Sequence, residues 1–213
     1  MVPAPDLRFE SALWSAGLTQ LAGMDEAGRG ALAGPVAVGA VILPAAADVL
    51  VQALEGVRDS KLMTPHERAQ SRPRIEACAL AWAVGFAEAA EIDALGIVAA
   101  TRLAASRALA ELAIFPEFLL TDFRLELPEL DLPQAAIVRG DQCCLSIAAA
   151  SVLAKTARDA RLCELDACYP GYGLGRHKGY GTDLHRRAIE QLGMSGIHRR
   201  TFRTGGQGRK QRL

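Results

Sequence analysis

Acidic side chains follow three apolar runs of this 213-residue sequence, and they are the residues best suited to chemistry. Asp25 and Glu26 follow the run LAGM, Asp122 follows FLLT, and Asp141 closes the segment AAIVRGD. In an open α/β sheet, ligands gather beyond the strand ends, so these carboxylates share one site if the three ends converge. A divalent cation would remove their mutual repulsion, and oxygen-only ligands favour Mg²⁺ or Mn²⁺.

Each acid also has a reading that involves no metal. Asp141 suits the N-cap of a helix, and Asp122 suits a turn. The adjacent pair Asp25–Glu26 is harder to explain in this way, because an apolar run leads into it and a glycine loop leaves it. Side chains alternate along a strand, so one of the pair must lie beyond the regular strand or bind through its backbone carbonyl. Only four histidines occur and none are spaced His-x-x-x-His, which argues against zinc.

The loop after the first acids contains Gly28, Arg29 and Gly30. Glycine lets a backbone approach a ligand closely, and arginine can bind a phosphate through two parallel hydrogen bonds. Taken alone, the tripeptide is better explained as an ordinary turn with a surface arginine. It also begins a loose match to the dinucleotide fingerprint G-x-G-x-x-A, but that fingerprint requires a helix next. Gly34-Pro35 and a valine-rich run follow instead, which argues against a nucleotide cofactor.

Charge is distributed unevenly along a chain whose net charge is zero. Residues 1–154 carry a balance of −8 and residues 155–213 a balance of +8. A basic C-terminal quarter is typical of a phosphate-binding surface, although a solvated helix face has the same composition. Tyr180 lies among cations in RHKGYG, which suits stacking on a sugar or base but also plain packing. Lys155 and Arg158 lie on a predicted helix and either contact phosphates or face solvent.

The elements that must position these residues can be read from periodicity and turn signals. Strands are predicted over residues 20–26, 35–43, 79–89, 117–122 and 135–141. Helices are predicted from the capping box at Thr64, over 91–113 with a weak point at Gly96, from about 145, and over 182–193; residues 169–181 are predicted as a loop. Short early connections suggest antiparallel pairing and the later helix suggests parallel addition, which gives a mixed α/β sheet with helices packed on it.

Composition limits the class of protein. Half of the residues are apolar and 23% are charged, as in globular proteins. No apolar run is long enough to span a membrane, and the N-terminus lacks the pattern of a secretory signal. The five cysteines show no Cys-x-x-Cys spacing, so free thiols are expected. We therefore expect a cytoplasmic protein with no membrane contact, and a monomer by default.

Sequence blocks from Gly23 to Phe202 together resemble one known family. The blocks GMDEAGRG, LAGPVAVGAVIL, DSKL, EID, GDQCCLSIAAASVLAKTARD, YPGYG, HKGYGT and IHRRTF occur in the order of ribonuclease HII, the type 2 ribonuclease H family. The resemblance implies a ribonuclease H-like mixed five-stranded sheet flanked by helices, with a C-terminal helical segment. It divides the chain into a catalytic core (1–165), a helical substrate-binding segment (166–204) and a basic tail (205–213) that is expected to be disordered.

The resemblance also implies an activity and roles for particular residues. The activity is metal-dependent cleavage of RNA paired with DNA, including incision 5′ of single ribonucleotides in duplex DNA, which leaves 5′-phosphate and 3′-hydroxyl ends. The cofactor is Mg²⁺ or Mn²⁺. The family's metal-binding and catalytic positions fall on Asp25, Glu26, Asp122 and Asp141. Its ribonucleotide contacts fall on Gly28, Arg29 and Gly30, its stacking tyrosine falls on Tyr180, and Lys155, Arg158 and Lys178 are expected to bind phosphate.

The sequence departs from the family pattern at a few positions. Phe123 replaces a glycine, Cys143 and Cys144 replace a segment with lysine and serine, and Leu62 replaces a lysine in the DSKL block. These changes bear on phosphate contacts and rate, so a binder of RNA–DNA hybrids without catalysis is a second hypothesis, and a nucleotide-dependent oxidoreductase is a third. The tail shows no clear sliding-clamp peptide, which leaves a clamp contact open.

Overall fold

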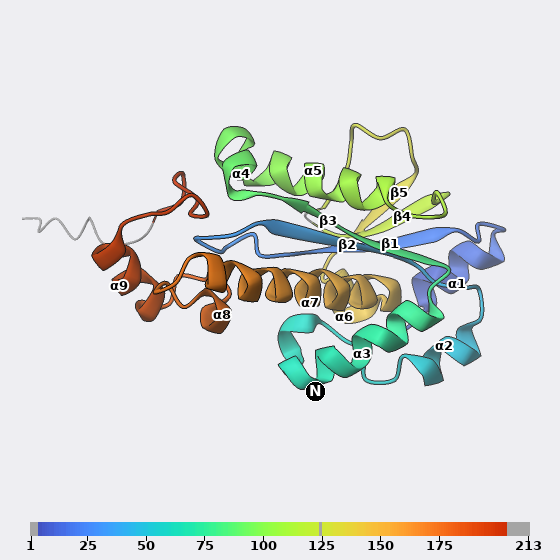
Figure 1. The fold of residues 1–213 in the computed structure, drawn as a ribbon. Coiled ribbons are helices and arrows are strands. Elements are labelled where there is room, and N and C mark those ends of the chain that lie inside the picture. Colours follow the sequence, from blue (N-terminus) through green and yellow to red (C-terminus); the bar gives the residue numbers. More distant parts are fainter. Residues whose placement is uncertain (1–3, 124, 204–213) are drawn as a thin grey trace, which may run out of the picture.

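The sheet at the centre of the molecule has five strands and mixed pairing (Figure 1). The computed structural model describes residues 4–123 and 125–203. The strands are β1 (Leu21–Ala27), β2 (Val36–Ile42), β3 (Ala81–Ala87), β4 (Phe118–Asp122) and β5 (Gln134–Ile137). Their order is β3-β2-β1-β4-β5; the first three pair antiparallel, whereas β4 runs parallel to β1 and β5 parallel to β4. The predicted mixed α/β sheet is confirmed.

Helices cover both faces of this sheet (Figure 1). One face carries α4 (Ala89–Leu95) and α5 (Ile97–Ala110). The other carries α7 (Leu145–Cys168) with α1 (Arg8–Ser15), α2 (Ala47–Ala53), α3 (Pro65–Cys78) and α6 (Gly140–Cys143). The 3₁₀ turn η1 (Ser60–Leu62) precedes α3, and α8 (Leu174–His177) and α9 (Asp183–Leu192) extend beyond the sheet. Among the described helices, none is long and apolar enough to cross a membrane.

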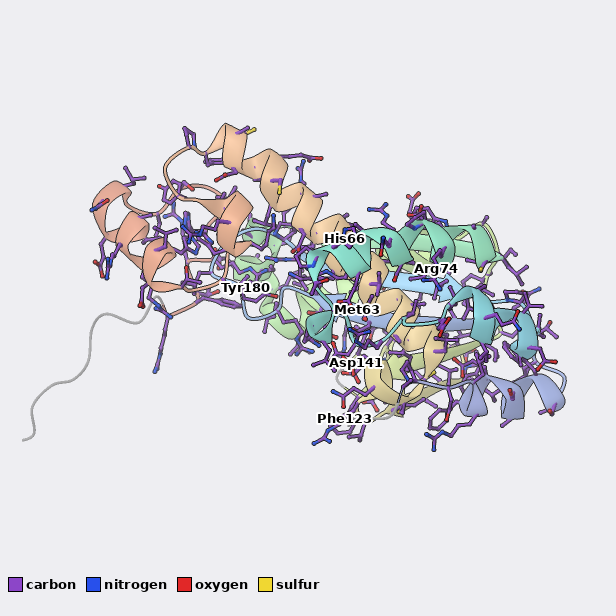
Figure 2. The ribbon with its side chains drawn as sticks, turned by 90° about the horizontal axis from the view of Figure 1, so that it is seen from below. Met63, His66, Arg74, Phe123, Asp141 and Tyr180 are labelled. Carbon is purple, nitrogen blue, oxygen red and sulfur yellow. The ribbon has the colours of Figure 1, made fainter. Side chains whose placement is uncertain are left out.

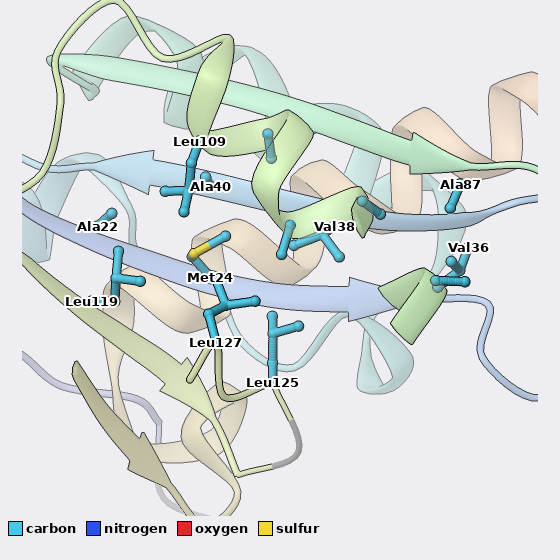
Figure 3. Close-up of a cluster of buried hydrophobic side chains, with 14 of the residues drawn as sticks. Ala22, Met24, Val36, Val38, Ala40, Ala87, Leu109, Leu119, Leu125 and Leu127 are labelled. Atoms are coloured by element: carbon cyan, nitrogen blue, oxygen red, sulfur yellow. The ribbon is translucent and has the colours of Figure 1, made fainter. Parts of the chain in front are cut away.

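Side chains of alternate residues divide the core into two layers. Met24 and Leu119 pack with Leu125 and Leu127 in the layer under α5 (Figure 3). Val41 belongs to the second layer, between the sheet and α7. This alternation follows from the two-residue repeat of a strand, so Asp25 and Glu26 face opposite sides of the sheet. Both lie within β1, so the predicted alternative that one of them lies beyond the regular strand is wrong.

Close approach of the helices to the sheet depends on glycine residues, which have no side chain. A Cβ atom on Gly39 of β2 would lie 2.3 Å from the carbonyl oxygen of Ala150 in α7. On the other face, a Cβ on Gly85 of β3 would lie 2.1 Å from the carbonyl oxygen of Ala104 in α5. Helix backbone therefore touches strand backbone on both sides, which fixes the distance between the layers.

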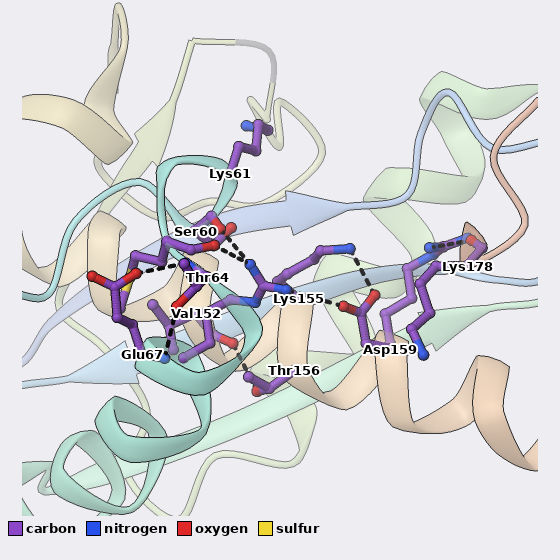
Figure 4. Close-up of polar contacts among 12 residues, drawn as sticks. Ser60, Lys61, Thr64, Glu67, Val152, Lys155, Thr156, Asp159 and Lys178 are labelled. Atoms are coloured by element: carbon purple, nitrogen blue, oxygen red, sulfur yellow. Dashed lines mark hydrogen bonds and ion pairs between the residues drawn. The ribbon is translucent and has the colours of Figure 1, made fainter. Parts of the chain in front are cut away.

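Local capping signals are confirmed by the structure. The Thr64 side chain accepts a hydrogen bond from the backbone N–H of Glu67, whose carboxylate accepts from the Thr64 N–H (Figure 4). Thr182 caps α9 by accepting from the His185 N–H, and Gly193 ends that helix. These contacts are local in sequence, which is why the pattern alone predicts them.

Several boundaries differ from the prediction. The helix predicted over 91–113 is two helices, because Gly96 has a φ of 77° between α4 and α5. The strand predicted to end at Asp141 ends at Ile137; Arg139 then takes a left-handed conformation with φ 55°, and Asp141 lies in α6. The sequence reading missed α1, α2 and α8.

The proposed domain boundary after residue 165 falls inside α7, which runs unbroken to Cys168. A small hydrophobic cluster crosses this boundary and joins the C-terminal segment to α7 and to the loop after β1; it includes Ala33, Leu162, Leu174, Ala188 and Ile197. The tail over 205–213 lies outside the described residues.

We expect Gly39→Ala to lower the free energy of unfolding by about 1–3 kcal/mol, because the added methyl group forces the backbones of β2 and α7 apart. Urea unfolding followed by circular dichroism measures the change. Val49→Ala on the exposed side of α2 is the control, with an expected change within about 0.5 kcal/mol. Equal stability of Gly39→Ala and the parent protein would contradict this account of the packing.

Candidate metal and phosphate-binding site

The sheet topology brings the acidic residues to one edge. Because β1 and β4 are parallel neighbours with Met24 opposite Thr121, Asp25 and Asp122 follow side by side on adjacent strands. Asp141 comes from α6, after β5, and lies near Phe123 (Figure 2). The Gly140 N–H donates to Asp122 Oδ1 over 2.8 Å, so the end of β4 is tied directly to the helix that carries Asp141.

Burial and like charge act together on the acids. Asp25 is 2% exposed, and burial raises its pKa well above the usual range, with the negative charges of Glu26, Asp141 and Asp122 raising it further. Burial is also the main cause that raises the pKa of Glu26 and of Asp141. All four carboxylates therefore lie close enough to repel one another in a partly dehydrated place.

Cations offset part of this repulsion. Lys61 Nζ lies 3.3 Å from Asp141 Oδ2 and 3.9 Å from Asp59 Oδ1. Burial lowers the pKa of Lys61, but Asp25, Asp59 and Asp141 raise it more, so the net change is a rise. Arg29 Nη1 lies 3.7 Å from Glu26 Oε1.

Lys61 and Asp59 are site residues that the sequence reading did not select. Both residues belong to the block DSKL, which indicates a function only through the family resemblance. Nothing local shows that η1 packs against α6, 80 residues later in the chain, so the pattern could not place Lys61 beside Asp141.

The oxygen atoms of the acids fit a divalent cation. Asp25 Oδ2 and Glu26 Oε2 are buried, and among the described residues neither has a hydrogen-bond partner. Buried charged oxygens without donors are unfavourable unless an ion completes them, and a set made only of carboxylates suits Mg²⁺ or Mn²⁺. As the side chains stand, no three described His, Cys, Asp or Glu residues form a group compact enough to hold an ion.

A groove of about 400 Å³ begins at Glu26 and runs along the glycine turn. Gly28 has a φ of 91°, and a Cβ there would lie 1.9 Å from Arg158 Nε, so its glycine is required by the protein itself. A Cβ on Gly30 would meet nothing within 4 Å. The groove is lined by Glu26, Ala27, Gly28, Arg29, Gly30, Ser60, Lys61, Lys155 and Tyr180.

Tyr180 forms the far wall of this groove and is 36% exposed. Lys155 Nζ lies 5.5 Å from the centre of its ring, and the Arg158 guanidinium lies 5.4 Å from it. Lys155 also pairs with Asp159 at 2.7 Å (Figure 4). An exposed aromatic ring backed by two cations is suited to stacking on a nucleotide.

Arg158 corrects an expectation from the sequence. It is fully buried rather than on a solvated face, and its guanidinium donates to the backbone carbonyls of Pro35, Ala33 and Lys178. These contacts leave it holding loops together instead of facing phosphate. The Lys178 ammonium is also bound internally, to the Gly175 carbonyl at 2.7 Å and to Cys163 Sγ at 2.8 Å. Of the predicted phosphate-binding cations after residue 150, Lys155 is the one that lines the groove.

A second groove, of about 380 Å³, lies on the other side of the acids. Its lining is Asp59, Lys61, Asp122, Phe123, Val138, Arg139, Asp141 and Gln142. Phe123 is 55% exposed there, so this departure from the family pattern faces the site. Cys144 is instead buried beside Glu10, with Sγ 3.1 Å from Oε1, and belongs to the core. All five cysteines are free thiols, as predicted.

Comparison with known proteins gives consistent results. The family model described as Ribonuclease HII matches residues 22–205. The chain is 51% identical over 203 residues to Ribonuclease HII of Dehalococcoides mccartyi strain 195, covering 93% of this chain and 92% of that protein. The structure of ribonuclease H2 from Pyrococcus horikoshii OT3 superposes with a TM-score of 0.70 at 25% identity, over 87% of this chain and 94% of that chain. The PCNA:RNase HII complex from Archaeoglobus fulgidus contains a chain with the same fold, with a TM-score of 0.70 at 24% identity over 86% of this chain and 95% of that chain.

We expect Asp25→Asn to raise the free energy of unfolding by about 0.5–2 kcal/mol without divalent ions, because it removes a buried, repelled charge. The pKa of this carboxyl is higher in the folded than in the unfolded state, so its unfavourable effect is full at high pH and disappears as pH falls. The gain over the parent should therefore shrink between pH 8 and pH 5 in urea unfolding.

Asp131→Asn, in an exposed loop, is the matched control, with an expected change within about 0.5 kcal/mol at either pH. Added MnCl₂ should raise the melting temperature of the parent and of the control but not that of Asp25→Asn. A destabilised Asp25→Asn variant would show that the carboxylate contributes favourably to folding, contrary to the site described here.

Proposed function

The chain belongs to the ribonuclease HII family, and we propose that it incises duplex DNA on the 5′ side of single ribonucleotides as well as cleaving RNA in RNA–DNA hybrids. The family makes it a ribonuclease H endonuclease that depends on divalent cations. One observation supports the finer proposal above all: Glu26, a member of the carboxylate cluster, and the Gly28–Gly30 turn line the same groove. A phosphate at the acids then lies beside backbone that can test for a ribose.

Asp25, Glu26, Asp122 and Asp141 are the proposed ligands of the cations. Bound there, divalent cations supply an activated water and stabilise the leaving 3′ oxygen, which yields 5′-phosphate and 3′-hydroxyl ends. Carboxylate oxygens accept both Mg²⁺ and Mn²⁺, and we propose that either supports the reaction. The protein's own part is to hold these oxygens together against their repulsion.

Backbone at the turn is proposed to read the 2′-hydroxyl, the group that separates RNA from DNA. Gly30 is exposed, and its missing side chain leaves space on the side of the groove. Packing does not require glycine at position 30, although it does at position 28. We therefore assign Gly30 to close approach of the substrate. Tyr180 at the opposite wall is proposed to stack under the deoxyribose that follows the ribonucleotide.

Cations along the groove are proposed to hold the phosphates on either side of the cleaved bond. Lys61 lies between the two grooves and lines both. Arg29 and Lys155 lie in the groove that contains Tyr180. Surface contacts of this kind make binding sensitive to salt.

We propose a monomer that acts in the cytoplasm, with residues 166–204 as the substrate-binding segment. The clamp contact belongs to the Archaeoglobus fulgidus protein. In this chain the tail over 205–213, which shows no clear clamp peptide, lies outside the described residues.

Incision of a defined duplex tests the function. A labelled DNA duplex with one ribonucleotide is incubated with the pure protein and Mg²⁺ or Mn²⁺, and a matched all-DNA duplex serves as control. We expect one cut, 5′ of the ribonucleotide, with a product that carries a 5′-phosphate. Asp122→Asn should abolish cutting because it removes a proposed ligand, whereas Asp131→Asn should cut like the parent.

Salt-sensitive binding of the duplex without any cut under either metal would favour the second hypothesis, a binder of RNA–DNA hybrids. Cutting of the all-DNA duplex at the same rate would contradict the proposed reading of the 2′-hydroxyl.

Gly30→Ala separates substrate approach from folding. We expect its free energy of unfolding to stay within about 0.5 kcal/mol of the parent, because the new methyl group meets no protein atom. Its kcat/KM for the single-ribonucleotide duplex should fall roughly tenfold or more, since the methyl group occupies the space given to the ribose. Gly28→Ala is the contrast, because it should lose stability through its clash with Arg158. Full activity of Gly30→Ala would exclude close contact at this position.

A further inference from the structure

Three histidines lie together behind Tyr180, on the side away from the groove. His177 ends α8, His185 lies in the first turn of α9, and His198 lies in the segment after α9. All three are at least nine-tenths buried. The rings of His177 and His185 stack with centroids 4.2 Å apart, and those of His185 and His198 are 5.3 Å apart.

Hydrogen bonds determine which nitrogen of each ring carries the proton. His198 Nδ1 accepts from the Ser195 N–H at 3.0 Å, so its proton is on Nε2, which then donates to His185 Nε2 at 3.2 Å. The proton of His185 is therefore on Nδ1, which donates to the Tyr180 carbonyl at 3.0 Å. His177 Nδ1 accepts from the Gly179 N–H, and its Nε2 donates to the Tyr172 carbonyl at 2.7 Å.

These assignments are consistent only when all three rings are neutral. Every ring nitrogen has a partner, and His198 Nδ1 has two, the N–H and the Oγ of Ser195. A second proton on His185 would point at the N–H of His198. Burial lowers the pKa of His185 to about 4, and burial lowers the pKa of His198 as well. The cluster thus contains a relay of hydrogen bonds from His198 through His185 to the Tyr180 carbonyl, with His177 stacked on His185.

The relay joins the backbone that carries Tyr180 to the backbone that follows the glycine turn. The Gly179 carbonyl accepts from the N–H groups of Leu32 and Ala33, two and three residues after Gly30 in the same loop. His198 forms a backbone bridge with Ala33 from the other side. The Tyr180 N–H donates to the His177 carbonyl, and the Tyr180 carbonyl accepts from His185 Nδ1 and from the Thr182 N–H.

We propose that His177, His185 and His198 are positioning residues for substrate binding, which fix Tyr180 against the Gly28–Gly30 turn by the hydrogen bond from His185 to the Tyr180 carbonyl. This rests on the proposed function, in which Tyr180 stacks on the nucleotide after the ribonucleotide. None of the three histidines lines the groove, so they act through Tyr180. Loss of this hydrogen bond from His185 weakens substrate binding and leaves the chemistry at the acids unchanged.

Two amide variants separate positioning from simple packing. In His185→Asn, the side-chain amide reaches the place of Nδ1 and can still donate to the Tyr180 carbonyl. In His185→Gln, the amide reaches the place of Nε2 and keeps the contact with His198 but loses Tyr180. Both side chains are neutral and polar, and each keeps one of the two contacts of the imidazole.

We expect His185→Gln to raise KM for the single-ribonucleotide duplex roughly fivefold, the value of one hydrogen bond, with kcat within about twofold of the parent. His185→Asn should keep a KM within about twofold of the parent, even if its melting temperature falls as much as that of His185→Gln. Equal KM values for the two amides, or a higher KM for His185→Asn, would overturn the proposal. A parent protein that does not cut at all would instead count against the proposed function.

The tautomers can be tested without activity and without variants. Nitrogen-15 NMR of the histidine side chains at pH 7.5 should show a proton on Nδ1 of His185 and on Nε2 of His177 and His198. An Nε2-protonated or doubly protonated His185 would overturn the relay, whatever the kinetics show.

Discussion

Carboxylates that repel one another in a partly dehydrated place are the constraint on which the structure depends. Asp25 and Glu26 lie near the end of β1, a strand that pairs on both sides. The two acids therefore cannot move apart without breaking the sheet. Asp122 is fixed to α6 by its bond to the Gly140 N–H. Burial raises the pKa of Asp25, and this unfavourable free energy is offset by packing elsewhere in the domain. The fold therefore holds negative charge at the site that is proposed to bind cations.

The frame that resists this repulsion is rigid because backbone touches backbone. Gly39 and Gly85 let α7 and α5 approach the two faces of the sheet without intervening side chains. A close-packed interior resists small displacements of its backbone. The positions of the strand ends are therefore set by the packing of the whole domain. Lys61, brought in by η1, then lowers the repulsion from outside the sheet.

Two buried arginines, Arg158 and Arg199, bind the backbone of the loops next to the groove. Arg158 donates to three backbone carbonyls, and Arg199 donates to the carbonyls of Gly34 and Arg29. Burial lowers the pKa of both arginines, for Arg199 to about 9. The arginines donate to loop carbonyls rather than to carboxylates, which fixes the backbone behind the glycine turn.

The sequence by itself determined what depends on neighbours along the chain. Strand and helix periods, the caps at Thr64 and Thr182 and the acids after apolar runs predicted a mixed sheet with carboxylates at its edge. Tertiary structure decided the rest, because those contacts join distant segments. It placed Asp141 on a helix rather than at a strand end, brought Lys61 to it across 80 residues, and buried Arg158 against carbonyls 123 and 125 residues away. A charged side chain reads the same in sequence whether it faces water or a loop, and only the folded chain supplies its partner.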